Sequence, residues 1–414
     1  MFIEFENAQK SIPIGRNVKG VIKVHLGEEF DGDQLTVTLK GFERTAFQPP
    51  VDDTKFQAGG DTIRKSELVI DQSFVIHRYP ADAVISPGQY EYPFELFIPA
   101  WLNESVMLQA DDNNLSLTFY LTSQIDARSS EGLAQAESNT SKLRTDTTLY
   151  LYKPVGEGEE AEEAKAELRI SLTGAPMNAE SPSDAHLSKS MHVKVAGVAG
   201  LGSSDVSAHV SIEKDVFQPG ELINITVDVD NSKCRKRVKS YKFKLNRRYE
   251  CYQGNGVKAP ILTKEEYLSE HKTDGGCAAK EREKVSFVFQ IPQQDTKFGK
   301  VDNLHPDLRQ MVKMFSTSIS GDLFHISYHL DVFVKHDSWN EFGMGNYVSF
   351  PITIVSPERD LPFMKAKISD FETNIGQEWN ATAREQIVQL SLVQNEDGSM
   401  TTQVTKNSQS MSAE

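Results

Sequence analysis

The chain has 414 residues, more than a single hydrophobic core normally fills, so its length predicts at least two domains. With 38% hydrophobic and 25% charged residues it has the composition of a soluble globular protein, and no apolar run reaches the roughly 18 residues of a membrane-spanning helix. A formal net charge of −15 argues against general nucleic-acid binding, because that binding depends on cations that contact phosphates.

The start of the chain and its cysteines indicate the compartment. Residues Met1–Glu6 contain neither a basic segment nor an apolar core, so they do not predict a secretory signal. The three cysteines, Cys234, Cys251 and Cys277, form no Cys-x-x-Cys pair, so they predict neither a disulfide framework nor a zinc site. We therefore expect a cytoplasmic protein.

Two segments about half the chain apart, residues 12–24 and 216–229, share one pattern. In each, a glycine turn precedes a strand of alternating apolar residues, and a second alternating strand follows. The matching apolar residues are Val18, Ile22, Val24, Leu35, Val37 and Leu39 in the first copy, and Ile223, Val227, Val229, Tyr241, Phe243 and Leu245 in the second. Because alternation buries one face of a strand and exposes the other, the repeat predicts two related antiparallel β domains in tandem.

The first domain is expected over residues 1–173. Further strands are predicted at 67–70, 92–99 and 115–121, with a turn at 111–114 where Asp and Asn tolerate positive φ. Segments 47–61 and 156–167 are predicted as solvated loops. The second loop contains the acidic run Glu157–Glu163, which is either a loop projecting into water or a docking site for a basic partner.

A linker is expected over residues 174–204, which are rich in Ser, Ala, Gly and Pro and include one possible strand near 191–195. The second domain is expected over 205–357. Besides the repeated pair of strands, its alternation predicts strands at 206–212, 285–291, 324–335 and 347–355, and apolar residues at helical spacing predict a short helix over 304–315.

Residues 358–414 are expected to form a flexible polar tail. Within it, Ile387–Leu392 alternates like a strand. This segment is either a strand added to the edge of a sheet or a peptide motif for a partner.

The sequence carries no recognisable catalytic motif, since it lacks Gly-x-Ser-x-Gly, Gly-x-x-x-x-Gly-Lys and His-Glu-x-x-His. His325 and His329 lie four residues apart in a predicted strand, which places them on one face but well apart along it. We interpret them as solvent-facing histidines rather than as metal ligands. The sequence therefore predicts a protein that is not an enzyme, with no cofactor and no metal.

One basic segment, residues 233–249, is the candidate functional site. Alternation predicts Tyr241, Phe243, Leu245 and Tyr249 in the core and the intervening cations on the outer face, with more cations in the connection before the strand. The candidate residues for binding a phosphate or a lipid headgroup are Arg235, Lys236, Arg237, Lys242, Lys244 and Arg248. The alternative is a solvated face whose cations pair with nearby acids.

Several short motifs resemble the arrestin family, and more closely its arrestin-domain-containing (α-arrestin) branch. In the first domain, Val37–Gly41 is similar to the family's strand ending in Leu-x-Gly, and Ser86–Pro99 resembles its glycine turn and Pro-Phe strand. In the second domain, Phe217–Glu221 with Asp230–Ser232 resembles the opening of the C-terminal arrestin domain, and Ser327–Val332 is similar to its Tyr-x-Leu-x-Val strand. The likeness extends over roughly residues 1–357.

The resemblance implies an all-β protein of two tandem immunoglobulin-like, arrestin-type β-sandwich domains with a polar C-terminal tail. It also implies a non-enzymatic adaptor that binds the cytoplasmic tails of membrane proteins, phosphorylated or not, and links them to endocytic, vesicle-trafficking or ubiquitylation machinery. Peripheral contact with anionic plasma or endosomal membranes would accompany this role. The Pro-Pro-x-Tyr motif of members that recruit ubiquitin ligases is missing from the tail. The alternative is a structural cargo-binding subunit of a coat complex similar to retromer.

Overall fold

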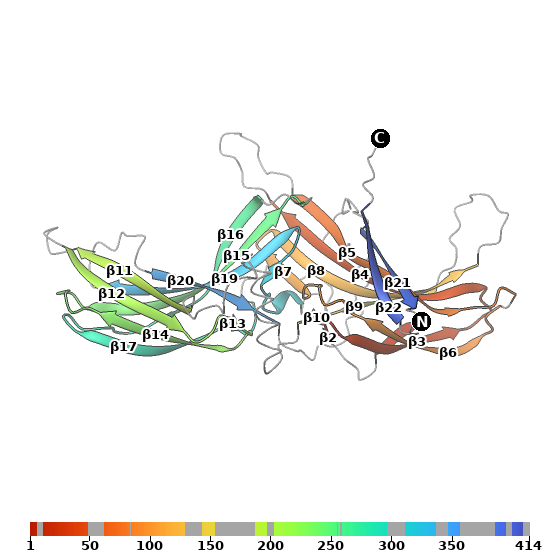
Figure 1. The fold of residues 1–414 in the computed structure, drawn as a ribbon, viewed down its shortest axis with the longest axis horizontal. Coiled ribbons are helices and arrows are strands. Elements are labelled where there is room, and N and C mark those ends of the chain that lie inside the picture. Colours follow the sequence, from red (N-terminus) through yellow and green to blue (C-terminus); the bar gives the residue numbers. More distant parts are fainter. Residues whose placement is uncertain are drawn as a thin grey trace, which may run out of the picture. The chain divides into compact units, whose positions relative to one another are not determined.

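The structure is a computed structural model, and it describes residues 1–5, 11–48, 62–82, 84–128, 143–153, 187–196, 203–254, 256, 259–295, 311–336, 347–356, 386–394 and 400–408. The described residues are almost entirely β-strands, which confirms the predicted all-β fold. The contacts between them divide the strands into two compact units, one with β1 to β10 and the hairpin β21–β22, the other with β11 to β20. Figure 1 shows the strands of each unit.

The first unit is a sandwich of two antiparallel sheets. Its strands are β1 (Phe2–Phe5), β2 (Ile12–Pro13), β3 (Asn17–Leu26), β4 (Gly32–Phe47), β5 (Ile63–Arg78), β6 (Gly88–Phe97), β7 (Val106–Ala110), β8 (Asn113–Ala127), β9 (Leu143–Leu149) and β10 (Leu151–Tyr152). One sheet has the order β1-β3-β6, and the other has the order β5-β4-β8-β7, with β9 also paired to β8. The short strands β2 and β10 pair with each other in parallel.

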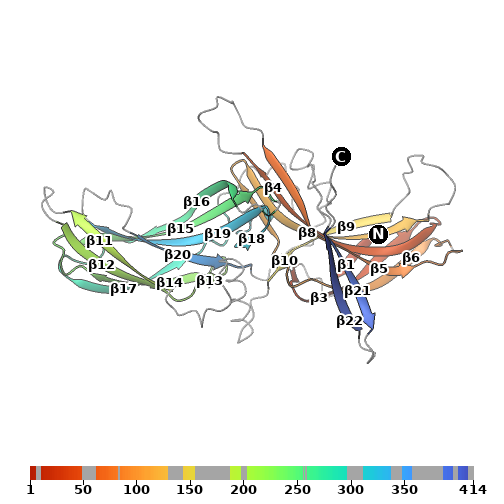
Figure 2. The ribbon, with the colours of Figure 1, turned by 45° about the horizontal axis from the view of Figure 1, so that its top comes forward.

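The second unit repeats this plan. Its strands are β11 (Ser188–Ala196), β12 (Ser203–Ile212), β13 (Val216–Phe217), β14 (Leu222–Asp230), β15 (Val238–Tyr252), β16 (Pro260–Lys272), β17 (Arg282–Gln290), β18 (Ile319–Ser320), β19 (Phe324–His336) and β20 (Tyr347–Ile354). One sheet has the order β11-β12-β14-β17. The other has the order β13-β20-β19-β15-β16, with β18 paired to β19. Figure 2 shows β15, β16 and β19 side by side in this second sheet.

The repeat predicted from the sequence is present in both units. Gly15 and Gly220 adopt positive φ angles of 79° and 86°, a conformation that glycine reaches without strain, and each glycine precedes the strand predicted after it. The twelve apolar residues matched between the copies are all buried. The short strands before the two glycines, β2 and β13, are each paired in parallel with a strand from the end of their own unit.

Most of the other predicted elements are also confirmed. Asp111, with a positive φ of 51°, turns the chain between β7 and β8. Strand β11 contains the strand predicted at 191–195, and residues 311–313 form a helical turn within the segment predicted as a helix. Among the residues that the structure describes, no helix is long and apolar enough to cross a membrane.

Some predictions concern parts of the chain that the structure describes only in part. The predicted loops lie outside the described residues from 49 to 61 and from 156 to 167, as does most of the tail and the predicted helix from 304 to 310. Within the tail, residues 386–394 do form a strand, β21 (Gln386–Gln394). It pairs with β22 (Met400–Ser408) as an antiparallel hairpin and joins neither of the larger sheets.

Candidate functional site

Strand β15 carries the candidate residues of the second unit, because its two faces have opposite chemistry. Tyr241, Phe243, Leu245 and Tyr249 are buried in the core, as the alternation predicts. The strand lies between β16 and β19, so every side chain on its outer face has a neighbour on both sides. The partners of the cations are therefore set by the register of these three strands.

Three of the predicted residues lie in the connection before β15. Arg235 and Arg237 are exposed, and Lys236 is half-buried. Asn231, which is fully buried, holds the connection in place: its Nδ2 donates hydrogen bonds to the backbone carbonyls of Lys236 and Ala278, at 2.9 and 2.8 Å. The buried Asn231 thus holds the backbone of this loop in place, while the side chains of Arg235 and Arg237 are exposed to solvent.

The other three predicted residues lie on β15 itself, and each has a partner nearby. The ammonium of Lys242 lies 2.6 Å from Glu270 of β16, and the guanidinium of Arg248 lies 2.6 Å from Glu250 on its own strand. The ammonium of Lys244 lies over two rings, 5.4 Å from the centre of Tyr267 and 5.7 Å from the centre of Phe333. Three of these partners, Glu270, Tyr267 and Phe333, belong to the neighbouring strands β16 and β19, so the sequence alone could not identify them.

The six predicted residues do not form one cluster. Arg248 lies six residues further along β15 than Lys242, a distance of about 20 Å in an extended strand. Lys242 and Lys244 are near neighbours on one face, and Arg235, Lys236 and Arg237 belong to the preceding connection. The basic segment therefore consists of an exposed loop, a pair of partnered lysines and one separate arginine.

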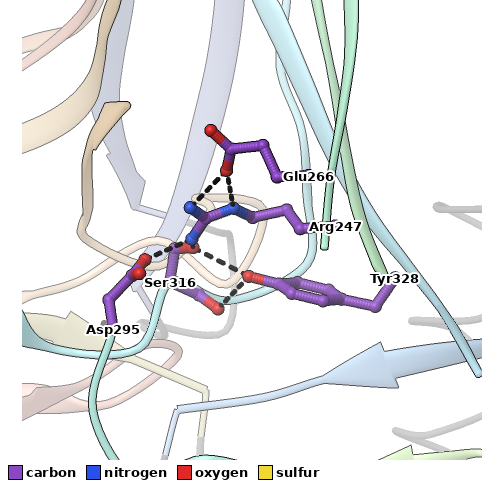
Figure 3. Close-up of polar contacts among 5 residues, drawn as sticks. All are labelled: Arg247, Glu266, Asp295, Ser316 and Tyr328. Atoms are coloured by element: carbon purple, nitrogen blue, oxygen red, sulfur yellow. Dashed lines mark hydrogen bonds and ion pairs between the residues drawn. The ribbon is translucent and has the colours of Figure 1, made fainter. Parts of the chain in front are cut away.

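A second charged feature of β15, a buried arginine, was not predicted. Arg247 has no exposed side-chain surface, although it is charged. Its Nε and Nη2 donate to Glu266 of β16 at 3.0 and 2.6 Å, and its Nη1 donates to Asp295 and, at 3.1 Å, to the hydroxyl of Ser316. Figure 3 shows these contacts converging on the guanidinium.

Tyr328 of β19 completes this buried network. Its hydroxyl donates to the backbone carbonyl of Ser316 at 2.7 Å, and the Ser316 hydroxyl contacts it at the same distance (Figure 3). Burial raises the pKa of Tyr328 to about 12, although Arg247 opposes the rise, so the hydroxyl keeps its proton. For Arg247, burial acts to lower the pKa, but Tyr328, Asp295 and Glu266 raise it above its usual value, so the guanidinium stays charged.

The network joins chain segments that are distant in sequence. Asp295 follows β17 and Ser316 follows the helical turn, and the two segments also meet directly, because the backbone N–H of Asp295 donates to the carbonyl of Lys313 at 3.0 Å. Gln294 and Met314 form a β-bridge beside this bond. Arg247 thus fixes both segments against the six-stranded sheet, and we interpret the network as a structural clamp.

The two histidines predicted to face solvent lie on the outer face of β19, as expected from their spacing, but they are half-buried there. Burial lowers the pKa of both His325 and His329, so both are neutral at pH 7. Within the described ranges, no three His, Cys, Asp or Glu side chains gather as metal ligands.

The fold is therefore that of a protein with two β-sandwich units in tandem. The second unit carries cations on the outer face of one sheet and a buried arginine network in its core. Residues 202–359, which include β12 to β20, match the family model of the arrestin (or S-antigen) C-terminal domain. Within these residues the chain is similar to the arrestin C-terminal domain, as the motifs of the second domain indicated. A search of curated proteins finds no match.

Proposed function

We propose that this protein is a non-enzymatic adaptor that binds the cytoplasmic tails of membrane proteins and links them to endocytic or vesicle-trafficking machinery. The observation that supports the proposal is the match of residues 202–359 to the arrestin C-terminal domain, because arrestin-family proteins are in general adaptors. The two sandwich units supply the sheet edges and broad faces to which an extended tail can bind. The protein would act in the cytoplasm and at the surface of plasma or endosomal membranes.

Within this function, the loop before β15 is our proposed contact for a phosphate or a lipid headgroup. Arg235 and Arg237 are exposed, and arginine can hold a phosphate with two parallel hydrogen bonds. Lys242, Lys244 and Arg248 are the other residues on β15 predicted for this contact, but their ammonium and guanidinium groups contact carboxylates or rings. Any anion that binds on β15 would have to compete with these contacts.

The proposal is tested by affinity capture with the full-length protein. Immobilised cytoplasmic tails of membrane proteins, in phosphorylated and unphosphorylated forms, should retain the protein in a manner that depends on the tail sequence. Retention by none of the tails would refute the adaptor function. Size-exclusion chromatography of the native protein tests the alternative, since a permanent coat subunit elutes in a large stable complex and an adaptor does not.

The domain boundaries also remain a proposal, with sandwiches at 1–173 and 205–357, a linker at 174–204 and a tail from 358. Limited proteolysis tests them, because exposed connections are cut before packed strands. Early cuts between residues 174 and 204 and after Pro357 are expected. Since β11 pairs along its whole length with β12, the first of these cuts should fall before Ser188 or after Ala196.

A further inference from the structure

The outer face of the six-stranded sheet in the second unit combines exposed aromatic rings with lysines. We call it the aromatic–lysine face, and its residues are Lys242, Lys244, Tyr267, Lys272, Phe333 and Tyr347. The register places Lys242 directly between Lys272 of β16 and Phe333 of β19, and Phe333 next to Tyr347 of β20. These side chains therefore form one continuous surface across four strands.

The aromatic rings of this face are ordered by contact with one another and with a lysine. Phe333 and Tyr347 stack with ring centres 5.0 Å apart, and Lys244 bridges Phe333 to Tyr267 through its two ring contacts. Tyr267 and Tyr347 nevertheless remain 40% and 44% exposed. Rigid, half-exposed tyrosines are the side chains that most often provide binding energy in protein interfaces, because little entropy is lost when they are covered.

The charge of the face is locally positive in a strongly acidic protein. Lys242, Lys244 and Lys335 all act on Glu270 and lower the pKa of its carboxyl group, with the hydrogen bond from Lys242 as the largest cause. Lys272 is exposed beside them. Three carboxylates, Glu265, Glu270 and Asp331, lie on the same face as these four lysines, whereas the whole chain has a net charge of −15. An acidic ligand would therefore be attracted to this face more than to the average surface of the molecule.

The same contacts select among acidic ligands. The ammonium of Lys242 is held by Glu270, and that of Lys244 lies on two rings, so neither is free to surround a dense phosphate cluster. Glu270 and Asp331 would also repel a highly charged headgroup. A carboxylate-rich peptide has a lower charge density, and its own aromatic side chain can stack on the exposed tyrosines.

We propose that the aromatic–lysine face binds an extended, unphosphorylated acidic peptide that contains an aromatic residue. The carboxylates of the peptide contact Lys272 and the edges of the lysine cluster, and its ring packs on Tyr267 or on the stacked pair Phe333 and Tyr347. This inference rests on the proposed adaptor function, because it names the chemistry of a tail that the adaptor would take.

The test begins with a display library of short random peptides selected against the full-length protein. Peptides rich in Asp and Glu with at least one Phe, Tyr or Trp should be enriched, and their affinity is then measured by fluorescence anisotropy. Charge reversal at an exposed position, Lys272→Glu, should weaken the selected peptide at least about tenfold, as should the double change Tyr267→Ala with Tyr347→Ala. The affinity should also fall as salt is raised.

Lys264→Glu is the matched control, because Lys264 is exposed on the same strand but its backbone lies opposite Tyr249, which faces the core. This variant should bind like the original protein. Thermal unfolding of each variant establishes that it is folded, and Lys272→Glu keeps the test decisive if the tyrosine variant does not fold.

Two results would overturn the inference. One is a selection without acidic aromatic peptides, or a selected peptide that binds Lys272→Glu and the control equally. The other is binding of phosphatidylserine vesicles that Lys272→Glu abolishes while peptide binding is unchanged, which would assign the face to a membrane. If tails are still captured by the protein in either case, only this inference fails and the adaptor function stands.

Discussion

Replacing Arg247 by methionine removes a buried charge from the clamp and leaves two carboxylates behind. The side chain of Asp295 is 2% exposed and that of Glu266 is 13% exposed, so water can replace the lost guanidinium less well at Asp295 than at Glu266. Removing one partner of a buried ion pair costs about 3–5 kcal/mol, because the other charge stays desolvated. We expect Arg247→Met to lower the stability of the second unit by this amount and its Tm by about 10 °C.

The rescue of this variant distinguishes the two carboxylates. Arg247→Met combined with Asp295→Asn should recover about 2 kcal/mol, since the amide carries no charge to desolvate. Arg247→Met combined with Glu266→Gln should recover less, because Glu266 is partly reached by water. The measurement is differential scanning calorimetry of the full-length protein, with urea unfolding as a second readout.

Arg282→Met is the control, since Arg282 also pairs with an aspartate, Asp230, but its side chain is 72% exposed. Its removal should leave the unfolding transition unchanged, because exposed ion pairs contribute little. The clamp would be refuted if Arg247→Met resembled this control. It would also be refuted if Asp295→Asn added its own loss to that of Arg247→Met instead of compensating for it.

Two further predictions concern stability. In the first unit, a Cβ on Gly20 would lie 2.6 Å from the ring of Phe94 and 2.7 Å from a backbone carbonyl. Gly20→Ala should therefore destabilise that unit by about 1–3 kcal/mol in calorimetry. Gly27→Ala, which has open space around it, should have no such effect, and equal effects of the two changes would contradict the packing. In the second unit, neither ring nitrogen of His336 has a hydrogen-bond partner among the described residues, and burial, followed by Lys236, lowers its pKa to about 4. Below about pH 6.5 the unfolded state binds a proton at His336 that the folded state does not bind until about pH 4. The free energy of unfolding is therefore unaffected by this histidine above pH 6.5 and decreases as the pH falls toward 4, by roughly 2 kcal/mol at pH 4.5. Urea unfolding of His336→Phe should lack this part of the pH dependence, and identical pH profiles would contradict it.

The repeat and the strands could be predicted because alternation is a local signal. The glycines at 15 and 220 and the apolar residues after them specify the same turn and strand in each copy, whatever the rest of the chain does. The resemblance to arrestins rested on motifs of the same local kind. The helix over 304–315 was predicted from spacing alone, and its described end forms a helical turn.

The clamp could have been found only in part. Arg247 stands two residues after Leu245 and two before Tyr249, so strict alternation already placed this arginine on the core face of β15. An arginine at a core position predicts a buried carboxylate partner. Nothing local identifies Asp295 or Ser316 as that partner, because 48 and 69 residues separate them from Arg247.

The cations of the outer face show the same limit. Alternation correctly placed Lys242 and Lys244 opposite the core, but their partners Glu270 and Tyr267 come from β16, whose register with β15 shifts at a bulge after Leu245. A shift of one residue exchanges the two faces of a strand, so sequence alone could not determine which acids and rings meet these lysines.

The adaptor function is tested most directly by an equilibrium titration of labelled cytoplasmic-tail peptides with the full-length protein, followed by fluorescence anisotropy. The account predicts saturable binding that depends on the sequence of the tail and is weakened when Lys272 is replaced by glutamate for tails that are acidic and aromatic. Binding that does not saturate for any tail, phosphorylated or unphosphorylated, would contradict it.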